Sequence, residues 1–254
     1  MGGGTEAHGG LAGARGALKD RRMAITCVLF DFSGTLFRVE PADRWLGSVL
    51  DAAGARYPAR TVTGWVRALE ESGGQPGGAP PRRLPAHLAG AWELRDLDPE
   101  RHRWAYTGLA REVELPDPAW YEALYERHMR PEAWAPYPDA VEVLTGLRER
   151  GVAVGVVSNI GWDPRPVFAA HGLGALVDAY ALSYEHRVRK PDARLFRVAL
   201  EALGGVDPGE ALMVGDDRDA DGGAARLGCA VRFVDHLPGA ERPAGLRPVL
   251  DLVG

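Results

Sequence analysis

A stretch near the start of the chain, FDFSGTLF at residues 30–37, places a carboxylate directly after an apolar run. A carboxylate at the end of a buried strand can attack a phosphoryl or alkyl centre and form a covalent ester. Asp31 is therefore the candidate nucleophile. The residues that follow it, Ser33, Gly34 and Thr35, are typical of a turn at the end of a strand.

A phosphoryl group is anionic, so attack on it by a carboxylate requires neutralising positive charge. Of the 30 lysines and arginines in the chain, only Lys19 and Lys190 are lysines. Arginine cannot replace a compact ammonium at every site, because its planar guanidinium fits different geometries. Lys190, in the sequence KPD, is therefore the candidate for this charge.

A second acidic group follows another apolar run, in the sequence VGDDRDAD. Mg²⁺ is a hard cation that prefers oxygen ligands. Asp216, the backbone carbonyl of Ser33 and one oxygen of Asp31 form a candidate magnesium site. Asp217 or Asp221 is either a further ligand or a residue that orients the lysine and a metal-bound water.

A third apolar run ends at Ser158 and Asn159. The Ser158 hydroxyl and nearby backbone N–H groups are suited to bind phosphate oxygens. Each of these four stretches can also be an ordinary turn or helix cap. Their order and spacing together favour one site for phosphoryl transfer.

The elements that must position this site follow from hydrophobic patterning. Continuous apolar runs are typical of strands buried on both faces of a parallel sheet. They lie at residues 25–30, 152–157, 178–183, 211–215 and 230–234. Helical patterns between them lie at residues 139–150, 164–171, 193–203 and 219–227. This alternation predicts a doubly wound α/β fold with a mainly parallel sheet, whose strand ends carry the site.

Residues 38–135 have no clear strand pattern. Helices are predicted there at 41–54, 59–71, 99–112 and 117–129, with a Pro- and Gly-rich break at 72–85. We interpret this segment as an all-helical cap inserted after the first strand, either a separate domain with its own core, a lid over the site, or both. Its tryptophans, Trp45, Trp65, Trp92 and Trp104, belong either to that core or to the pocket.

The predicted organisation is a disordered tail over residues 1–22, an α/β core over 23–37 and 136–254, and the cap over 38–135. Met1 and Met23 both remain candidate starts of the protein. The net charge of −5 and the pI of about 5.8 argue against nucleic acid or an anionic membrane as a partner. No run approaches the roughly 18 apolar residues of a membrane span.

Two cysteines, Cys27 and Cys229, lie far apart in apolar surroundings without metal or redox spacing. We expect buried free thiols and a cytoplasmic protein. A chain of 254 residues can bury its own core, so either a monomer or a homodimer is expected.

The motifs FDFSGTLF, VVSN, EHRVRKPD and VGDDRDAD, in this order, resemble those of the haloacid dehalogenase superfamily. The helical insert is similar to the cap of its dehalogenase-like branch. The resemblance covers nearly everything from residue 23 onward. It implies a hydrolase, most simply a Mg²⁺-dependent phosphatase that acts on a small phosphorylated metabolite through an aspartyl-phosphate.

The resemblance also implies roles for individual residues. Asp31, Ser33, Ser158 and Lys190 are expected to take part in catalysis. Substrate binding is assigned to Thr35, Ser158, Asn159 and Lys190. The metal ligands are assigned to Asp31, Ser33, Asp216 and Asp221.

Ser33 departs from the family pattern, because most family phosphatases and phosphomutases have aspartate there. That aspartate protonates the leaving group and then activates the hydrolytic water. A serine hydroxyl is too weak an acid for either task, and such acid–base help is worth roughly 10²–10⁴ in rate. One interpretation is a phosphatase restricted to good leaving groups, or one in which a cap residue substitutes, with His87, His102 and His128 as candidates.

Two other interpretations stay open. A metal-independent haloacid dehalogenase resembles Asp-x-Tyr-Gly-Thr and also lacks the second aspartate, but the acidic cluster at Asp216 argues for a cation. A protein that only binds a phosphorylated ligand or a protein partner is the third. A phosphonatase is disfavoured because residues 38–135 contain no lysine for a Schiff base. A phosphomutase is disfavoured because it needs the missing acid and base.

Overall fold

The computed structural model describes residue 1 and residues 24–253. The tail predicted over residues 1–22 therefore lies, apart from Met1, outside the described residues. The predicted division into tail, core and cap domains stays a prediction.

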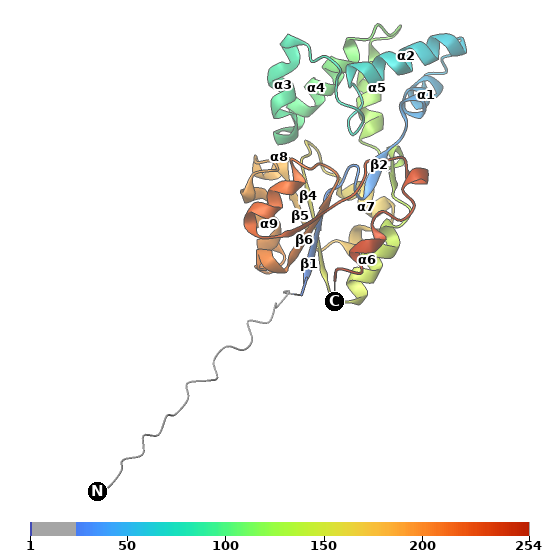
Figure 1. Ribbon diagram of the computed structural model, residues 1–254. Helices are drawn as coiled ribbons and strands as arrows, with labels where there is room; N and C mark the ends of the chain where they lie inside the picture. Colours follow the sequence, from blue (N-terminus) through green and yellow to red (C-terminus); the bar gives the residue numbers. More distant parts are fainter. Residues whose placement is uncertain (2–23, 254) are drawn as a thin grey trace.

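A five-stranded parallel sheet forms the centre of the described chain, in the order β5-β4-β1-β6-β7 (Figure 1). Its strands are β1 (Cys27–Phe30), β4 (Ala153–Ser158), β5 (Ala179–Leu182), β6 (Ala211–Gly215) and β7 (Ala230–Phe233). The central strand β1 is buried throughout and pairs in parallel with β4 and β6. The predicted α/β fold with a parallel sheet is confirmed, and each observed strand lies within two residues of its predicted bounds.

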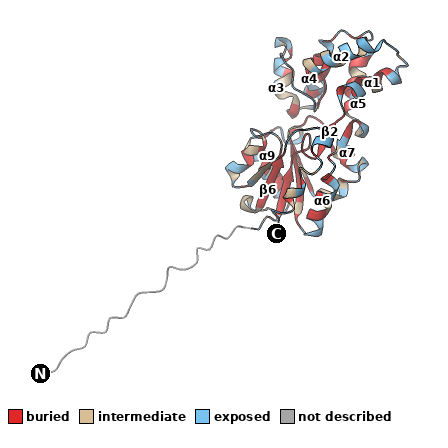
Figure 2. Ribbon diagram, turned by 45° about the vertical axis from the view of Figure 1, so that its right-hand side comes forward, coloured by how far each residue is buried: buried red, intermediate tan, exposed pale blue. Residues whose placement is uncertain are grey.

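Helices cover both faces of the sheet, because successive strand residues point to opposite sides. On one face, Val28 and Phe30 pack against α6 (Ala140–Glu149) and α7 (Arg165–Ala170). On the other face, Cys27 and Leu29 pack against α9 (Ala193–Ala202). Figure 2 shows the resulting buried layer between exposed outer helix faces.

One predicted helix in this part is wrong. The segment predicted as a helix over residues 219–227 forms a turn and then a 3-10 helix, η6 (Asp221–Leu227). Two glycines at its start weaken α-helix formation. Gly223 also lies so close to the backbone of Pro191 that a Cβ atom would come within 2.6 Å of the Pro191 carbonyl oxygen.

The segment after β1 carries helices α1 (Ala42–Ala52), α2 (Ala59–Ser72), α3 (Ala89–Leu94), α4 (Pro99–Arg111) and α5 (Ala119–His128). Figure 1 shows these helices beyond the carboxyl edge of the sheet. Helices α1, α2, α4 and α5 enclose a separate apolar cluster built around Trp45, Leu46 and Leu124, with Trp65 packed against it. Trp104 belongs to neither the cluster nor the pocket, since 54% of it is exposed.

Two features of this segment were not predicted. Antiparallel strands β2 (Phe37–Val39) and β3 (Trp134–Pro136) join it to the rest of the chain, so the expectation of no strands is wrong at its two ends. Three residues are too few to show alternation in a sequence. A further helical region follows the Pro- and Gly-rich break. It consists of α3 and the short 3-10 helices η1 (Ala86–Leu88) and η2 (Arg95–Leu97).

Cys27 and Cys229 are buried free cysteines, as predicted. No helix within residues 24–253 has the length and apolar character needed to cross a membrane.

Candidate active site

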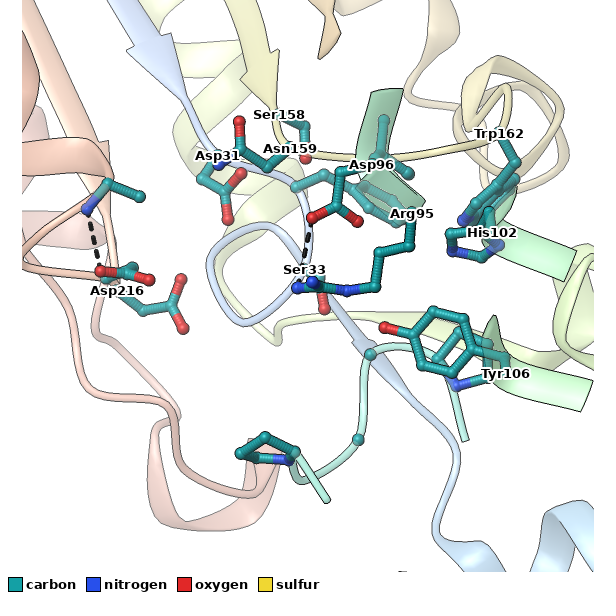
Figure 3. Close-up of a pocket in the computed structure, with 18 of the residues that line it drawn as sticks. Asp31, Ser33, Arg95, Asp96, His102, Tyr106, Ser158, Asn159, Trp162 and Asp216 are labelled. Atoms are coloured by element: carbon teal, nitrogen blue, oxygen red, sulfur yellow. Dashed lines mark hydrogen bonds and ion pairs between the residues drawn. The ribbon is translucent and has the colours of Figure 1, made fainter. Parts of the chain in front are cut away.

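The carboxyl ends of three adjacent strands bring the predicted residues to one pocket of about 300 Å³. Asp31 follows β1, Ser158 ends β4 and Asp216 follows β6. Asp31 stays in register with its neighbour, since its backbone N–H donates to the Val214 carbonyl at 2.9 Å. Ligand sites in open α/β sheets form at this edge, and here residues of η2 and α4, among them Arg95, Asp96 and Tyr106, line the opposite side of the pocket (Figure 3).

Lys190 links two of the predicted carboxylates. Its Nζ lies 2.7 Å from Asp31 Oδ1 and 2.6 Å from Asp221 Oδ1, and all three residues are buried. Asn159 holds the lysine segment in place through two hydrogen bonds with the Lys190 backbone, at 2.7 and 2.9 Å. The structure thus gives Asn159 a positioning role, and its direct contact with substrate stays a prediction.

Burial has the largest effect on the ionisation of Asp31, and the neighbouring charges modify it. Burial raises the pKa of Asp31 to about 7, against the opposing charge of Lys190, and the nearby carboxylates of Asp221 and Asp216 raise it further. The pKa of Lys190 is raised by the two carboxylates it contacts, although burial opposes this. The charge balance of the site therefore favours the binding of a cation.

Asp216 is held by two side chains. The Thr35 hydroxyl donates to its Oδ1 at 3.2 Å, and His236 Nδ1 lies 2.7 Å from its Oδ2. Burial opposes ionisation of Asp216, but the hydrogen bond and charge of His236, together with Lys190, lower its pKa. Thr35 is fully buried and does not line the pocket. The structure thus gives it a role in positioning Asp216, and its contact with substrate stays a prediction.

Two glycines let these groups approach one another. Gly34 has φ +83°, and a Cβ atom there would lie 2.4 Å from both Asp216 Oδ2 and His236 Nδ1. A Cβ atom on Gly215 would lie 2.0 Å from Asp221 Oδ2. The motif glycines are therefore required by close packing around the carboxylates.

The donor set fits a hard cation. Carboxylate oxygens of Asp31, Asp216 and Asp221 lie within 4.8 Å of one another. Asp221 is fully buried, and its oxygens accept from Lys190 and from the Asp217 backbone N–H at 3.0 Å. Asp217 itself accepts from the backbone N–H groups of Asp219 and Ala220, which makes it a turn cap in this geometry.

Ser33 lines the pocket beside the nucleophile, but no carboxylate occupies its position. The cap histidines proposed as substitutes differ in place. His87 is exposed, lies 3.5 Å from Glu112 and does not line the pocket. His102 and His128 do line it and are buried.

Burial makes His102 and His128 poor proton donors. It lowers the pKa of His102 to about 3, with a contribution from Arg95. Burial and the neighbouring His102 place the pKa of His128 well below its ordinary value. Both rings are therefore neutral near pH 7, so the candidate acids among the cap histidines are not supported.

Several pocket residues were missed by sequence reasoning. They are Arg95 and Asp96 on η2, Tyr106 on α4, the aromatic residues Trp134 and Trp162, the loop residues 76–80, and His236. Residues 76–80 belong to the Pro- and Gly-rich break, which was interpreted only as an interruption between helices. His236, in the segment after β7, follows no recognisable motif.

Comparison with known proteins agrees with this geometry. The family model for haloacid dehalogenase-like hydrolases matches residues 25–228. The chain belongs to the haloacid dehalogenase-like hydrolases. The predicted superfamily, and the prediction of a hydrolase, are confirmed at this level.

Relatives within this family have two kinds of activity. The chain is 29% identical over 208 residues to an (S)-2-haloacid dehalogenase of Burkholderia cepacia, covering 81% of this chain and 80% of that one. It is 40% identical over 114 residues to a phosphoserine phosphatase of Thermus thermophilus, a match that covers 44% of this chain and 42% of that protein. The chain thus spans less than half the length of that phosphatase.

Solved structures show the same fold. The L-2-haloacid dehalogenase of Xanthobacter autotrophicus aligns with a TM-score of 0.58 at 24% identity, covering 90% of this chain and 86% of that one. A magnesium-bound hydrolase of the superfamily from Bacillus subtilis aligns with a TM-score of 0.59 at 16% identity, covering 83% and 89%.

Proposed function

We propose that this protein is a Mg²⁺-dependent phosphatase that forms an aspartyl-phosphate on Asp31. The observation that carries the proposal is the buried cluster in which Lys190 lies 2.7 Å from Asp31 and 2.6 Å from Asp221, with Asp216 beside them. The cluster has one ammonium for three carboxylates. It needs a cation before an anionic substrate can bind.

The same charge balance separates this proposal from a dehalogenase. A 2-haloacid is itself an anion, and similarity to the Burkholderia cepacia enzyme makes this the second candidate. However, Asp216 has a lowered pKa and remains ionised next to the nucleophile. A metal-independent site would place the substrate carboxylate close to this charge, which is offset by His236 and Lys190 rather than by a cation.

Asp31, Asp216, the Ser33 carbonyl and Asp221 would hold the metal. When bound, Mg²⁺ supplies positive charge that stabilises the phosphoryl oxygens. Lys190 neutralises further charge and orients Asp31, while the Ser158 hydroxyl donates to a phosphate oxygen. Oδ of Asp31 then attacks phosphorus, the bond to the leaving oxygen breaks, and water later cleaves the aspartyl-phosphate.

The pocket supports a small substrate. Its volume of about 300 Å³ is divided between the charged strand ends and an aromatic side that includes Tyr106, Trp134 and Trp162. This space suits a phosphate group joined to a compact organic group that contacts aromatic rings. We therefore propose a small phosphorylated metabolite as the substrate class.

The test is a panel of alkyl, aryl and acyl phosphates and 2-haloacids, assayed for phosphate and halide release with Mg²⁺ or with EDTA. The expected result is phosphate release that requires Mg²⁺ and disappears in Asp31→Asn. Exposed Asp117→Asn serves as the matched control and retains activity. Halide release in EDTA would instead support the dehalogenase, and a panel without turnover above Asp31→Asn would support a binding-only protein.

A further inference from the structure

A carboxyl group on the cap faces the site that lacks one at Ser33. Asp96, on η2, lines the same pocket as Asp31 and Ser33. Figure 3 shows its side chain pointing into the pocket from the cap side, opposite the ends of the strands. No sequence motif marks this residue, because it lies about 65 positions from the nucleophile and on a different part of the fold.

Core residues fix the position of this part of the cap. The Ser183 hydroxyl donates to the Asp96 carbonyl at 2.5 Å, and the Arg189 guanidinium donates to the Glu93 carbonyl at 2.6 Å. Gly161 packs so tightly here that a Cβ atom would come within 2.4 Å of the Arg95 carbonyl oxygen. Asp96 is therefore held relative to the strand ends by direct contacts between cap and core.

Asp96 is also the pocket carboxyl group to which no other structural role is assigned. Among the described pocket carboxylates, Asp31 and Asp216 belong to the proposed metal cluster, and Asp217 caps a turn. Asp96 Oδ2 lies 3.2 Å from the Arg95 guanidinium, and none of the described residues forms a hydrogen bond with its Oδ1. One oxygen thus remains available to the contents of the pocket.

The surroundings of Asp96 favour a group that can carry a proton. It is 7% exposed, and burial raises its pKa despite the opposing charges of Arg95, Arg189 and Lys190. His102 and His128 cannot take this role as acids, because burial keeps both rings neutral. The third pocket histidine, His236, contacts Asp216 in the proposed metal cluster at 2.7 Å. A carboxyl with a raised pKa is suited to general acid–base catalysis near neutral pH.

We propose that Asp96 is the general acid and base of the reaction and replaces the carboxyl that is missing at Ser33. The inference rests on the proposed phosphatase function. In the first step, Asp31 Oδ forms a bond to phosphorus, the bond from phosphorus to the leaving oxygen breaks, and the Asp96 proton passes to that oxygen. In the second step, water attacks phosphorus, its proton passes to the Asp96 carboxylate, and the bond to Asp31 breaks.

The test compares Asp96→Asn with wild type on two probes, p-nitrophenyl phosphate and an alkyl phosphate such as glycerol phosphate. The alkyl group leaves poorly and needs the proton, so kcat/KM for it should fall roughly 10²–10⁴-fold. The aryl group needs little protonation. With that probe the variant should release p-nitrophenol in a rapid burst equal to the enzyme concentration, followed by slow turnover.

Asp98→Asn is the matched control. Asp98 lies two positions away, does not line the pocket and caps α4 by accepting from the Glu100 and Arg101 backbone N–H groups. Asparagine keeps this cap. Activity of Asp98→Asn should match wild type, and Ser33→Asp should restore alkyl phosphate turnover in the Asp96→Asn protein.

A second variant keeps the inference testable if Asp96→Asn fails to fold. Arg95→Met removes the nearest opposing charge, so the alkaline limb of kcat/KM for the alkyl phosphate should move to higher pH. An unmoved limb would overturn the inference.

The outcomes are distinguishable. Equal activity of Asp96→Asn and Asp98→Asn on the alkyl phosphate, or an equal loss on both probes without a burst, would overturn the role of Asp96 while Asp31-dependent turnover remained. A wild-type protein without Asp31-dependent turnover on either probe would overturn the proposed function itself.

Discussion

Replacement of His128 by leucine should make the protein more resistant to acid. His128 is fully buried on α5, and neither of its ring nitrogens has a hydrogen-bond partner among the described residues. Burial and the nearby His102 place its pKa well below the ordinary value. A histidine of this kind is neutral when folded but takes up a proton when the chain unfolds, so the free energy of unfolding decreases as pH falls through about 6.5.

The magnitude follows from proton linkage. Between pH 7.5 and 5.5, one histidine that stays neutral in the folded state and titrates near 6.5 when unfolded lowers the free energy of unfolding by about 1.4 kcal/mol. The pKa of His102 is lowered to about 3, so it contributes an equal amount over the same range. His128→Leu removes one of the two contributions. Relative to wild type, the variant should therefore gain about 1.4 kcal/mol of stability on moving from pH 7.5 to 5.5.

The assay is urea unfolding of both proteins, followed by tryptophan fluorescence, at pH 7.5, 6.5 and 5.5. Leucine is close to histidine in volume, so changes in packing alter the stability at every pH by the same amount. His186→Leu, at an exposed histidine, should retain the wild-type pH dependence. A difference between His128→Leu and wild type that does not change with pH would refute the reasoning.

Three further predictions concern the cluster itself. Gly34→Ala should lower the free energy of unfolding by about 1–3 kcal/mol, because residue 34 has φ +83° and the added Cβ atom would lie 2.4 Å from Asp216 and His236. The same crowding should weaken the stabilisation by Mg²⁺, and urea unfolding with and without Mg²⁺ measures both effects. Lys190→Met should abolish turnover and lower the free energy of unfolding by about 3–5 kcal/mol, because it leaves the buried carboxylates of Asp31 and Asp221 unpaired. Calorimetry should show a smaller loss of stability at acid pH, where these carboxylates are protonated. Saturation with Mg²⁺ at 100 times its Kd should raise the unfolding free energy by about 2.7 kcal/mol, and Asp216→Asn should lose this gain.

Local patterning predicted the sheet well because its strands are continuous apolar runs bounded by glycines and polar residues. The positions of Asp31, Lys190, Asp216 and Asp221 followed from the same logic, since each stands where a strand ends or a helix starts. Asp31, Asp216 and Asp221 meet through the adjacent parallel strands β1 and β6, and Lys190 joins them from the segment after β5, held by Asn159 at the end of β4. This part of the site is encoded in short motifs.

The cap side of the pocket could not be predicted in this way. Asp96 and Arg95 reach the site through packing of η2 against Gly161 and Ser183, contacts that join segments about 65 and 87 residues apart. Sequence alone also does not show that the Thr35 hydroxyl turns toward Asp216. The short strands β2 and β3 lack enough residues to show a period.

The central claim is that Asp31 forms a covalent bond with phosphorus. It is tested most directly by acid quenching of a single turnover of a phosphate ester, cleavage after Arg22 and Arg38, and mass spectrometry of the peptide that contains Asp31. We expect a hydroxylamine-sensitive phosphate on Asp31 that requires Mg²⁺ and is absent from Asp31→Asn. Turnover of the same ester by Asp31→Asn at the wild-type rate would contradict it.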